Sequence, residues 1–386
     1  MAPQARRCGG PGRLPGGWSI ASGLLAATLS LAIPTAGLAQ TPRVRVLLLS
    51  GAATVRLVEA SGRSRALEFS EAGVRVAGKS RKGTVRAGAD DQITRVGEWR
   101  VRGGVEVRAG ESGLDVVNDL PLDAYLAGTL GNEMYPSWPR EALRAQAVAS
   151  RSYALYRSAR AQGEFALTSG TRSQVYRGVG SESAAVWEAV RSTRGEVLTA
   201  GGEPILAAFH SDSGGRTASS EEVWGKGLGY LVPVDVIDEG DSPDTYWRSE
   251  VSRTTLRRAL ERRGHSVGRI QAVEVTLRAA SGRVQRLRVD SSAGSVELTG
   301  RELRDALGSR ALRSTLFQIR ESDEAIAFVG SGRGHGVGMS QWGARAMAER
   351  GADYREILSH FYPGARFEVL GARQHEAPRK ARGAAR

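Results

Sequence analysis

Cysteine is almost absent from this chain of 386 residues, and histidine is scarce. The single cysteine, Cys8, lies in an N-terminal stretch that we expect to be removed, so the mature chain has no disulfide bonds and no thiolate chemistry. The five histidines show no clustered ligand spacing, which argues against a structural metal site. No internal repeat is evident either.

Long apolar runs are also lacking, with one exception near the N-terminus. Three arginines precede an apolar run from Trp18 to Ile33, and the small residues PTAGLAQ after it suit cleavage behind Ala39. We therefore expect a signal peptide over residues 1–39 and an exported protein in the periplasm or cell wall. The run is short for a stable membrane span, so none is expected after cleavage, with an uncleaved anchor as the alternative.

Positive charge prevails over negative charge. The formal net charge is +13, and it falls to +10 without the three arginines of the signal peptide. A chain this basic attracts polyanions. Export argues against nucleic acid as a partner and favours an anionic wall polymer or a membrane surface, although many arginines could simply cover solvated faces. Residues 371–386 form a basic tail that we expect to be disordered.

The apolar pattern predicts an α+β fold with two β lobes. Over residues 40–118, alternating bursts such as Val44, Val46 and Leu48 are separated by Gly, Ser and Asp turn signals, which predicts a β-rich N-terminal lobe. Between residues 273 and 298 the alternation returns with two glycine-containing turns. This pattern predicts three antiparallel strands of a second β lobe.

Helices are predicted between and after these lobes. Pro139, whose missing N–H suits the first helical position, opens a long helix. The sequence Thr299-Gly300-Arg301-Glu302 matches a capping box that opens another. Further helices are expected over residues 184–192, 340–350 and 354–360.

One carboxylate, Glu133, is a candidate for chemistry. It lies in a proline-bounded aromatic loop just ahead of the long helix, and we expect Met134, Tyr135 and Trp138 to give it a partly apolar wall. Such surroundings raise a carboxyl pKa and make the group a proton donor near neutral pH. From the pattern alone, the alternative is an ordinary solvated loop glutamate.

Three further features concentrate polar residues, as a site built from several loops does. Arg151 lies on an apolar helix face, where it can point inward as an anion ligand or ion-pair partner, or pack its stem on the surface. His210 opens a segment rich in Ser and Glu that lacks the spacing of a serine nucleophile. A glycine-rich loop, 330–338, carries His335 and leads to Gln341, and we expect both to line a polymer groove instead of holding a nucleotide.

Three ordered segments resemble the SpoIID/LytB (stage II sporulation protein D) domain family. They are LPLDAYLAGTLGNEMYPSWPREALRAQAVASRSYALY, HSDSGGRTASSEEVWG and GRGHGVGMSQWGARAMAERGADYREILSHFYPGARF. The resemblance implies a catalytic domain over residues 119–370, formed by a helical segment, the second β lobe and the C-terminal helices. It implies a lytic transglycosylase that cleaves peptide-free peptidoglycan strands at the MurNAc-GlcNAc bond, leaves 1,6-anhydro ends and uses no cofactor.

The resemblance also implies roles for single residues. Glu133 falls at the position of the catalytic glutamate, which acts first as acid and then as base. Arg151 falls at a required arginine. Tyr246 and Arg248 fall at substrate-site positions, with Arg248 standing for a lysine. Arg151 and Arg248 would pair with lactyl carboxylates on the glycan strand.

Some members of this family bind zinc through a His-x2-Cys-x5-Cys pattern. The corresponding positions here are His210, Ser213 and Ser219. Because serine is a poor zinc ligand compared with cysteine, no metal is expected.

Two other functions stay open. One is a non-catalytic wall-binding module that stimulates an N-acetylmuramoyl-L-alanine amidase, which would make a cell-wall amidase its partner. The other is a true hydrolase that pairs Glu133 with an acid such as Asp235 and leaves a reducing end. Product chemistry separates these possibilities from the transglycosylase.

Overall fold

The computed structural model describes residues 42–371, except residues 164, 171–172 and 238. The predicted signal peptide and the predicted tail from residue 372 onward lie outside the described residues. Within the described part, no helix is both long and apolar enough to span a membrane.

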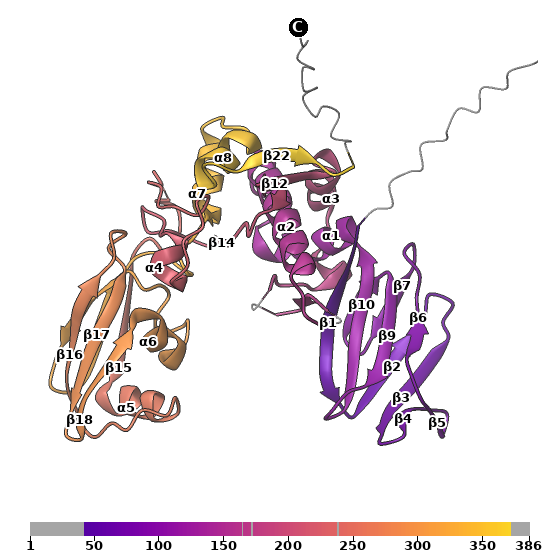
Figure 1. The fold of residues 1–386 in the computed structure, drawn as a ribbon, viewed down its shortest axis with the longest axis horizontal. Coiled ribbons are helices and arrows are strands. Elements are labelled where there is room, and N and C mark those ends of the chain that lie inside the picture. Colours follow the sequence, from indigo (N-terminus) through magenta and orange to yellow (C-terminus); the bar gives the residue numbers. More distant parts are fainter. Residues whose placement is uncertain (1–41, 164, 171–172, 238, 372–386) are drawn as a thin grey trace, which may run out of the picture. The chain divides into compact units, whose positions relative to one another are not determined.

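The N-terminal region consists of two mainly antiparallel sheets (Figure 1). One has the order β11-β1-β10-β9-β6 and the other β5-β4-β3-β2-β7-β8. Val44, Val46 and Leu48 alternate inward on β1, as the period of two predicts. The strands are β1 (Arg43–Ala52), β2 (Thr54–Val58), β3 (Ser64–Ser70), β4 (Gly73–Val76), β5 (Lys79–Arg81), β6 (Val85–Ala87), β7 (Ile93–Val96), β8 (Trp99–Arg102), β9 (Gly104–Ala109), β10 (Leu114–Pro121) and β11 (Leu167–Thr168).

A helical segment follows β10, and it corrects one prediction. Glu133 is the last residue of a helix, α1 (Leu122–Glu133), and does not lie in a loop. The spacing of apolar residues does not reveal this helix, because it is buried on nearly every side and has no polar stripe. Gly128 and Gly131 permit that burial, since a Cβ at either would clash with Tyr176 or with the backbone of Ser181.

The remaining helices of this segment agree closely with the sequence. The long helix α2 (Arg140–Ala159) begins one residue after Pro139, which caps it. Helix α3 (Ala184–Ser192) has the predicted bounds. A short 3-10 turn, Gly178–Ser181, precedes α3.

Segments far apart in the chain complete the first hydrophobic core. Strand β14 (Phe209–His210) pairs in parallel with β21 (Met339–Ser340), so the His210 segment meets the glycine-rich loop. The core takes buried residues from Val44 to Val236 and again from Val337 to Tyr362. Its other elements are β12 (Glu196–Ala200), β13 (Glu203–Pro204), α4 (Ser220–Trp224), α7 (Gln341–Glu349), α8 (Tyr354–Phe361) and β22 (Arg366–Val369).

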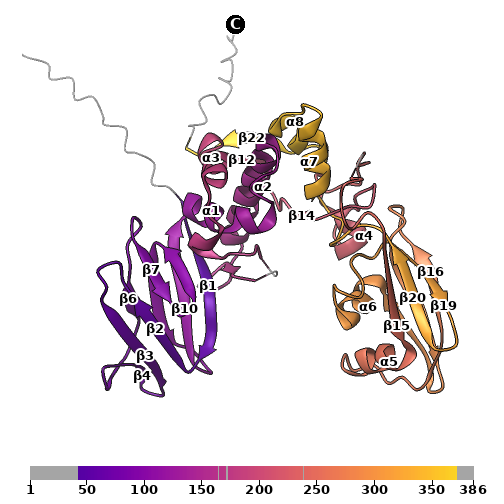
Figure 2. The same cartoon turned by 180° about the vertical axis from the view of Figure 1, so that it is seen from behind.

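A second core occupies the chain between these two parts. It runs from Trp247 to Phe328 and has two antiparallel sheets, β15-β20-β19 and β16-β17-β18, against which α5 and α6 pack (Figure 2). The three predicted strands and the capping box at Thr299 are confirmed. The elements are β15 (Trp247–Ser252), α5 (Arg253–Glu261), β16 (Ile270–Arg278), β17 (Val284–Ser291), β18 (Gly294–Thr299), α6 (Gly300–Leu307), β19 (Phe317–Glu321) and β20 (Ala325–Gly330). The α+β class is therefore confirmed.

A buried carboxylate, Glu239, ties the loop after β14 to the start of α7. Its Oε2 accepts the hydroxyl of Ser213 at 2.6 Å and the N–H of Gly215 at 2.9 Å. Its Oε1 accepts the N–H of Ser213 at 2.9 Å and the hydroxyl of Ser340. Hydrogen bonds to a charged acceptor in the interior are stronger than bonds between neutral groups.

Replacement of Glu239 by alanine tests this connection. Glu239→Ala leaves four donor groups without their acceptor, and we expect it to lower the free energy of unfolding by about 3 kcal/mol. The matched control is Asp241→Ala, because the Asp241 side chain is 77% exposed and its ion pair with Arg345 is weak. Urea unfolding curves that shift equally for both variants would contradict the role of Glu239.

Candidate functional site

Glu133 lines a cavity of about 730 Å³. The wall combines the helical segment with the His210 segment, the glycine-rich loop and α6. Side chains that matter for chemistry on this wall are Glu133, Tyr153, Arg157, His210, Trp224 and His335. Three regions that are distant in the sequence therefore meet around one carboxyl group.

The carboxyl group of Glu133 is held by the backbone and is partly buried. Its Oε1 accepts the N–H of Val175 at 2.8 Å. Burial raises the pKa of Glu133 above its ordinary value of 4.5, and hydrogen bonds from Val175 and from the side chain of Gln341 oppose that rise only in part. The raised pKa was predicted, and its direction is confirmed.

The groups that surround Glu133 differ from the predicted ones. Met134, Tyr135 and Trp138 do not line this cavity. Tyr135 is mostly exposed and Met134 is buried in the core, because consecutive residues at a helix end point in different directions. The apolar wall comes instead from residues that follow Glu133 by more than 15 positions: Tyr153, Val175, Leu206, Ala208 and Phe209.

Two neutral imidazoles form the opposite wall. His210 lies with Nδ1 3.1 Å from the carbonyl oxygen of Val337, so Nδ1 carries the proton there. His335 accepts the N–H of Val337 on Nδ1 at 3.0 Å. Burial lowers the pKa of His210 well below its usual range and, with the nearby charges of Arg283 and Arg304, holds that of His335 at about 4. Both rings therefore offer hydrogen bonds without charge at neutral pH.

An aromatic and a cationic surface complete the cavity. Trp224 lies 5.4 Å from His335 between ring centroids. Arg157 lies 6.0 Å from the centroid of Tyr153. Arg301 and Arg304 line the cavity from α6. Sequence reasoning missed these arginines, since nothing local distinguishes them among the 54 lysines and arginines of the chain.

Gln341 lies next to Glu133, as a site residue on the third segment should. It is buried at the start of α7, and its Nε2 donates to Oε1 of Gln146 on α2 at 3.3 Å. Its side chain also lies near enough to Glu133 to oppose the rise in the pKa of that carboxyl group. The structure thus brings Glu133, His210, His335 and Gln341 together.

Arg151 points inward, as one reading of its helix face predicts, but it does not line the cavity. Its side chain is 1% exposed. The guanidinium donates to the carbonyls of Glu196 and Val190 at 3.1 and 3.2 Å, and it lies 3.7 Å from the carboxylate of Asp123. These contacts connect α2 to α1 and α3 and leave no face open to a ligand.

The other two expected substrate residues also lie apart from Glu133. Tyr246 is 85% exposed and lines smaller surface pockets beside β19 and β20. Arg248 lies on β15 and pairs with Glu250 at 2.5 Å. Neither residue lines the Glu133 cavity. Asp235, the acid considered for a hydrolase, is likewise outside it and pairs with Arg216.

The positions considered for zinc have other bonding roles. Ser213 donates its hydroxyl to Glu239, and Ser219 caps α4 by accepting the N–H of Glu222 at 3.1 Å. Within residues 42–371 as described, no group of three or more His, Cys, Asp or Glu residues is arranged to hold a metal ion.

Two family models match the chain, in separate places. The model described as "Stage II sporulation protein" (SpoIID) matches residues 110–199, which include Glu133. A domain of unknown function, DUF8618, matches residues 237–338, which include the second core. A single catalytic domain over residues 119–370 stays a prediction.

Sequence relatives extend over more of the chain. An uncharacterised protein of Brachyspira hyodysenteriae is 35% identical over 253 residues, which is 64% of this chain and 67% of that protein. An amidase enhancer of Bacillus subtilis is 31% identical over 284 residues, but the match spans only 39% of its length. Stage II sporulation protein D of Bacillus amyloliquefaciens is 31% identical over 264 residues, which is 64% of this chain and 74% of that protein. With the Glu133 region inside the SpoIID match and a relative of that name covered over most of its length, this chain belongs to the SpoIID family.

Proposed function

We propose that the chain is an exported lytic transglycosylase of the bacterial cell wall. Its substrate would be a peptidoglycan strand without stem peptides, cut at the MurNAc-GlcNAc bond to leave a 1,6-anhydro end. The observation that carries the proposal is the environment of Glu133, a carboxyl group with a raised pKa in a cavity large enough for sugar units.

One carboxyl group serves both steps of this reaction. Protonated Glu133 donates its proton to the glycosidic oxygen that leaves C1 of the muramic acid unit. The resulting carboxylate accepts the proton of the C6 hydroxyl of the same sugar as that oxygen attacks C1. Because the nucleophile belongs to the substrate, no activated water and no second carboxylate are needed. The N–H of Val175 holds the carboxyl group in one orientation.

The cavity wall supports an anionic glycan as the substrate. Arg157, Arg301 and Arg304 face it together with two carboxyl groups, those of Glu133 and Asp305. With Glu133 protonated, cations therefore exceed anions on this wall. These arginines, in place of Arg151 and Arg248, would pair with lactyl carboxylates of the strand.

Asp305 is the residue that would have to act as the second carboxyl group of a hydrolase. It is the second carboxyl on the cavity wall, but its side chain is about half exposed and lies 3.7 Å from the guanidinium of Arg301. A carboxylate that is half exposed and paired with an arginine is poorly placed to hold a water against the sugar. We therefore favour single-carboxyl chemistry.

A second candidate function rests on the relative named amidase enhancer. In this alternative the cavity binds glycan without cutting it, and the chain acts by stimulating a cell-wall amidase. The raised pKa of Glu133 argues for catalysis, because a purely binding site has no use for a buried acid.

The first test is the chemistry of the product. We expect the mature protein to release anhydro-ended fragments from peptide-free glycan strands, detected by mass spectrometry. Glu133→Gln keeps the size and the hydrogen bonds of the side chain but cannot donate an acidic proton, and should lower the rate at least about a hundredfold.

Asp305→Asn is the matched control for this test, since it removes the other carboxyl of the same cavity. The transglycosylase should keep its anhydro product in this variant. Reducing ends in place of anhydro ends, lost in Asp305→Asn, would establish a hydrolase. Intact strands that bind both wild-type protein and Glu133→Gln would favour the amidase-enhancing role.

The pH dependence of the reaction gives a second prediction. Glu133 must be protonated in the free enzyme, so kcat/KM should fall tenfold per pH unit once the pH exceeds its raised pKa. No second ionisation is required of another carboxylate, so the profile should be one-sided. A bell-shaped profile between pH 4 and 8 would contradict catalysis by one group used twice.

The stability of the folded protein should also depend on the raised pKa of Glu133. Because the folded protein holds the Glu133 proton more tightly than the unfolded chain does, the stability of the wild type falls as pH rises from about 4.5 through the raised pKa. Glu133→Gln lacks this loss. Its melting temperature relative to wild type, measured by calorimetry, should therefore rise between pH 4 and pH 7. A constant difference would mean that burial does not perturb Glu133.

A further inference from the structure

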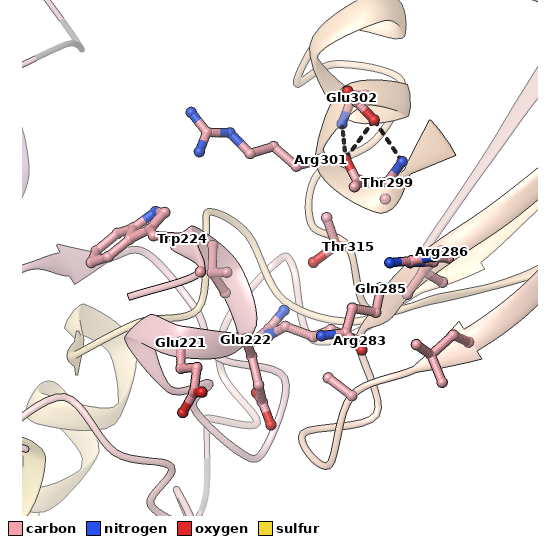
Figure 3. Close-up of a pocket in the computed structure, with 16 residues that line it drawn as sticks. Glu221, Glu222, Trp224, Arg283, Gln285, Arg286, Thr299, Arg301, Glu302 and Thr315 are labelled. Carbon is pink, nitrogen blue, oxygen red and sulfur yellow. Dashed lines mark hydrogen bonds between the residues drawn. The ribbon is translucent and has the colours of Figure 1, made fainter. Parts of the chain in front are cut away.

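Figure 3 shows the residues that line a second cavity, of about 590 Å³. Trp224 and Arg301 line both this cavity and the Glu133 cavity, so the two are neighbours with these side chains between them. In Figure 3 both residues lie at one end of the second cavity, with Gln285 and Arg286 at the other. Most of its wall belongs to the region matched only by a domain of unknown function.

Arg283 is the unusual residue in this cavity. It is 3% exposed, and its Nη2 donates to the carbonyl of Ser213 at 2.7 Å. Its Nε and Nη1 are buried and have no hydrogen-bond partner among the described residues. Buried donors without acceptors cost free energy, so an arrangement of this kind indicates a missing polar partner.

A second residue of the cavity lining, Glu222, also has a buried polar atom without a partner among the residues that the structure describes. Figure 3 shows the Arg283 side chain reaching from the start of β17 toward Glu222 on α4. The Oε2 atom of Glu222 is buried and lacks a partner within the described part of the chain. A ligand that satisfies both residues must therefore accept a hydrogen bond from Arg283 and donate one to Glu222. A hydroxyl group does both.

The charge of the lining selects among hydroxyl-bearing ligands. Three arginines and three glutamates line the cavity, so their formal charges cancel: Arg283, Arg286 and Arg301 with Glu221, Glu222 and Glu302. An anionic ligand would meet three carboxylates and a cationic one three guanidiniums. A neutral ligand rich in hydroxyls avoids both repulsions. The indole of Trp224 adds the flat apolar surface on which the C–H face of a sugar ring packs.

We propose that the second cavity is a subsite for a neutral sugar unit of the same strand that is cut at Glu133. The uncharged N-acetylated sugar would occupy it, bonded to Arg283 and Glu222 and packed on Trp224. This proposal rests on the proposed action on glycan strands, and it gives the inserted lobe a role in holding the strand beyond the cleavage point.

The test is oligosaccharide binding in the absence of cleavage. The full mature protein carrying Glu133→Gln is titrated calorimetrically with N-acetylchitotetraose, a neutral β-1,4-linked probe. Glu222→Gln in that background keeps the side-chain shape but replaces an acceptor with a donor, and we expect binding to weaken about tenfold. Gln285→Ala, at the other end of the cavity, should weaken it in the same direction.

Two controls make the result specific. Glu297→Gln removes the same charge from β18 of the same lobe outside the cavity, and it should leave binding unchanged. Because the cation excess at the Glu133 wall also affects charged ligands, the second cavity is tested by the effect of Glu222→Gln: this change should weaken binding of the neutral probe more than binding of the cationic tetramer of glucosamine or the anionic tetramer of galacturonic acid. Thermal melting confirms that each variant is folded.

The outcomes separate this inference from the proposed function. Anhydro products from the wild type, with unchanged probe binding in folded Glu222→Gln and Gln285→Ala, would overturn the subsite and leave the transglycosylase standing. Probe binding that depends on Glu222, without anhydro products, would keep the subsite and remove the catalytic proposal. An equal effect of Glu222→Gln on the binding of neutral and charged tetramers would overturn the selection for a neutral sugar.

Discussion

The hydrogen bonds of Glu239 hold the loops on which the rest of the site depends. They join the residues after β14 to Ser340, which lies 101 positions after Glu239 in the chain and caps α7. With these ends fixed, His210 at the end of β14 lies on the wall of the Glu133 cavity, and Gln341 at the start of α7 lies close enough to Glu133 to influence its pKa. A water-exposed link would be too weak for this role, whereas a buried carboxylate with four donors has one favourable geometry.

Burial then sets the chemistry of the cavity by acting in opposite directions on acids and bases. It raises the pKa of Glu133 and lowers those of His210 and His335, because the charged form is the less favourable one in each case. The cavity therefore has one acid that gives up its proton less readily than a solvated glutamic acid, and two imidazoles that stay uncharged. Such a division suits a reaction that needs a single proton donor and neutral hydrogen-bonding surfaces around it.

The lobe inserted between the two parts of the first core contributes directly to this site. Arg301 and Arg304 on α6 belong to the wall around Glu133, and Arg283 and Gln285 at the start of β17 belong to the neighbouring cavity. Its own hydrophobic core allows the lobe to hold these side chains in fixed positions. Cationic side chains are thus unevenly distributed between the two cavities. They outnumber carboxylates in the Glu133 cavity, whereas the two kinds of charge are equal in number in the neighbouring cavity.

The sequence alone determined the features that depend on neighbouring residues. The capping box at Thr299 and the hairpins of the second β lobe follow from short patterns, because their physics acts over a few positions. The apolar wall around Glu133 does not, because it comes from residues more than 15 positions away. The buried helix that ends at Glu133 has no polar stripe, so the spacing of its apolar residues did not predict it. Only the tertiary structure decided that Arg151 is an interior connection, and that Arg283 and Trp224 border an open cavity. Those roles depend on which distant carbonyls and carboxylates each side chain meets, and that information arises only when the chain folds.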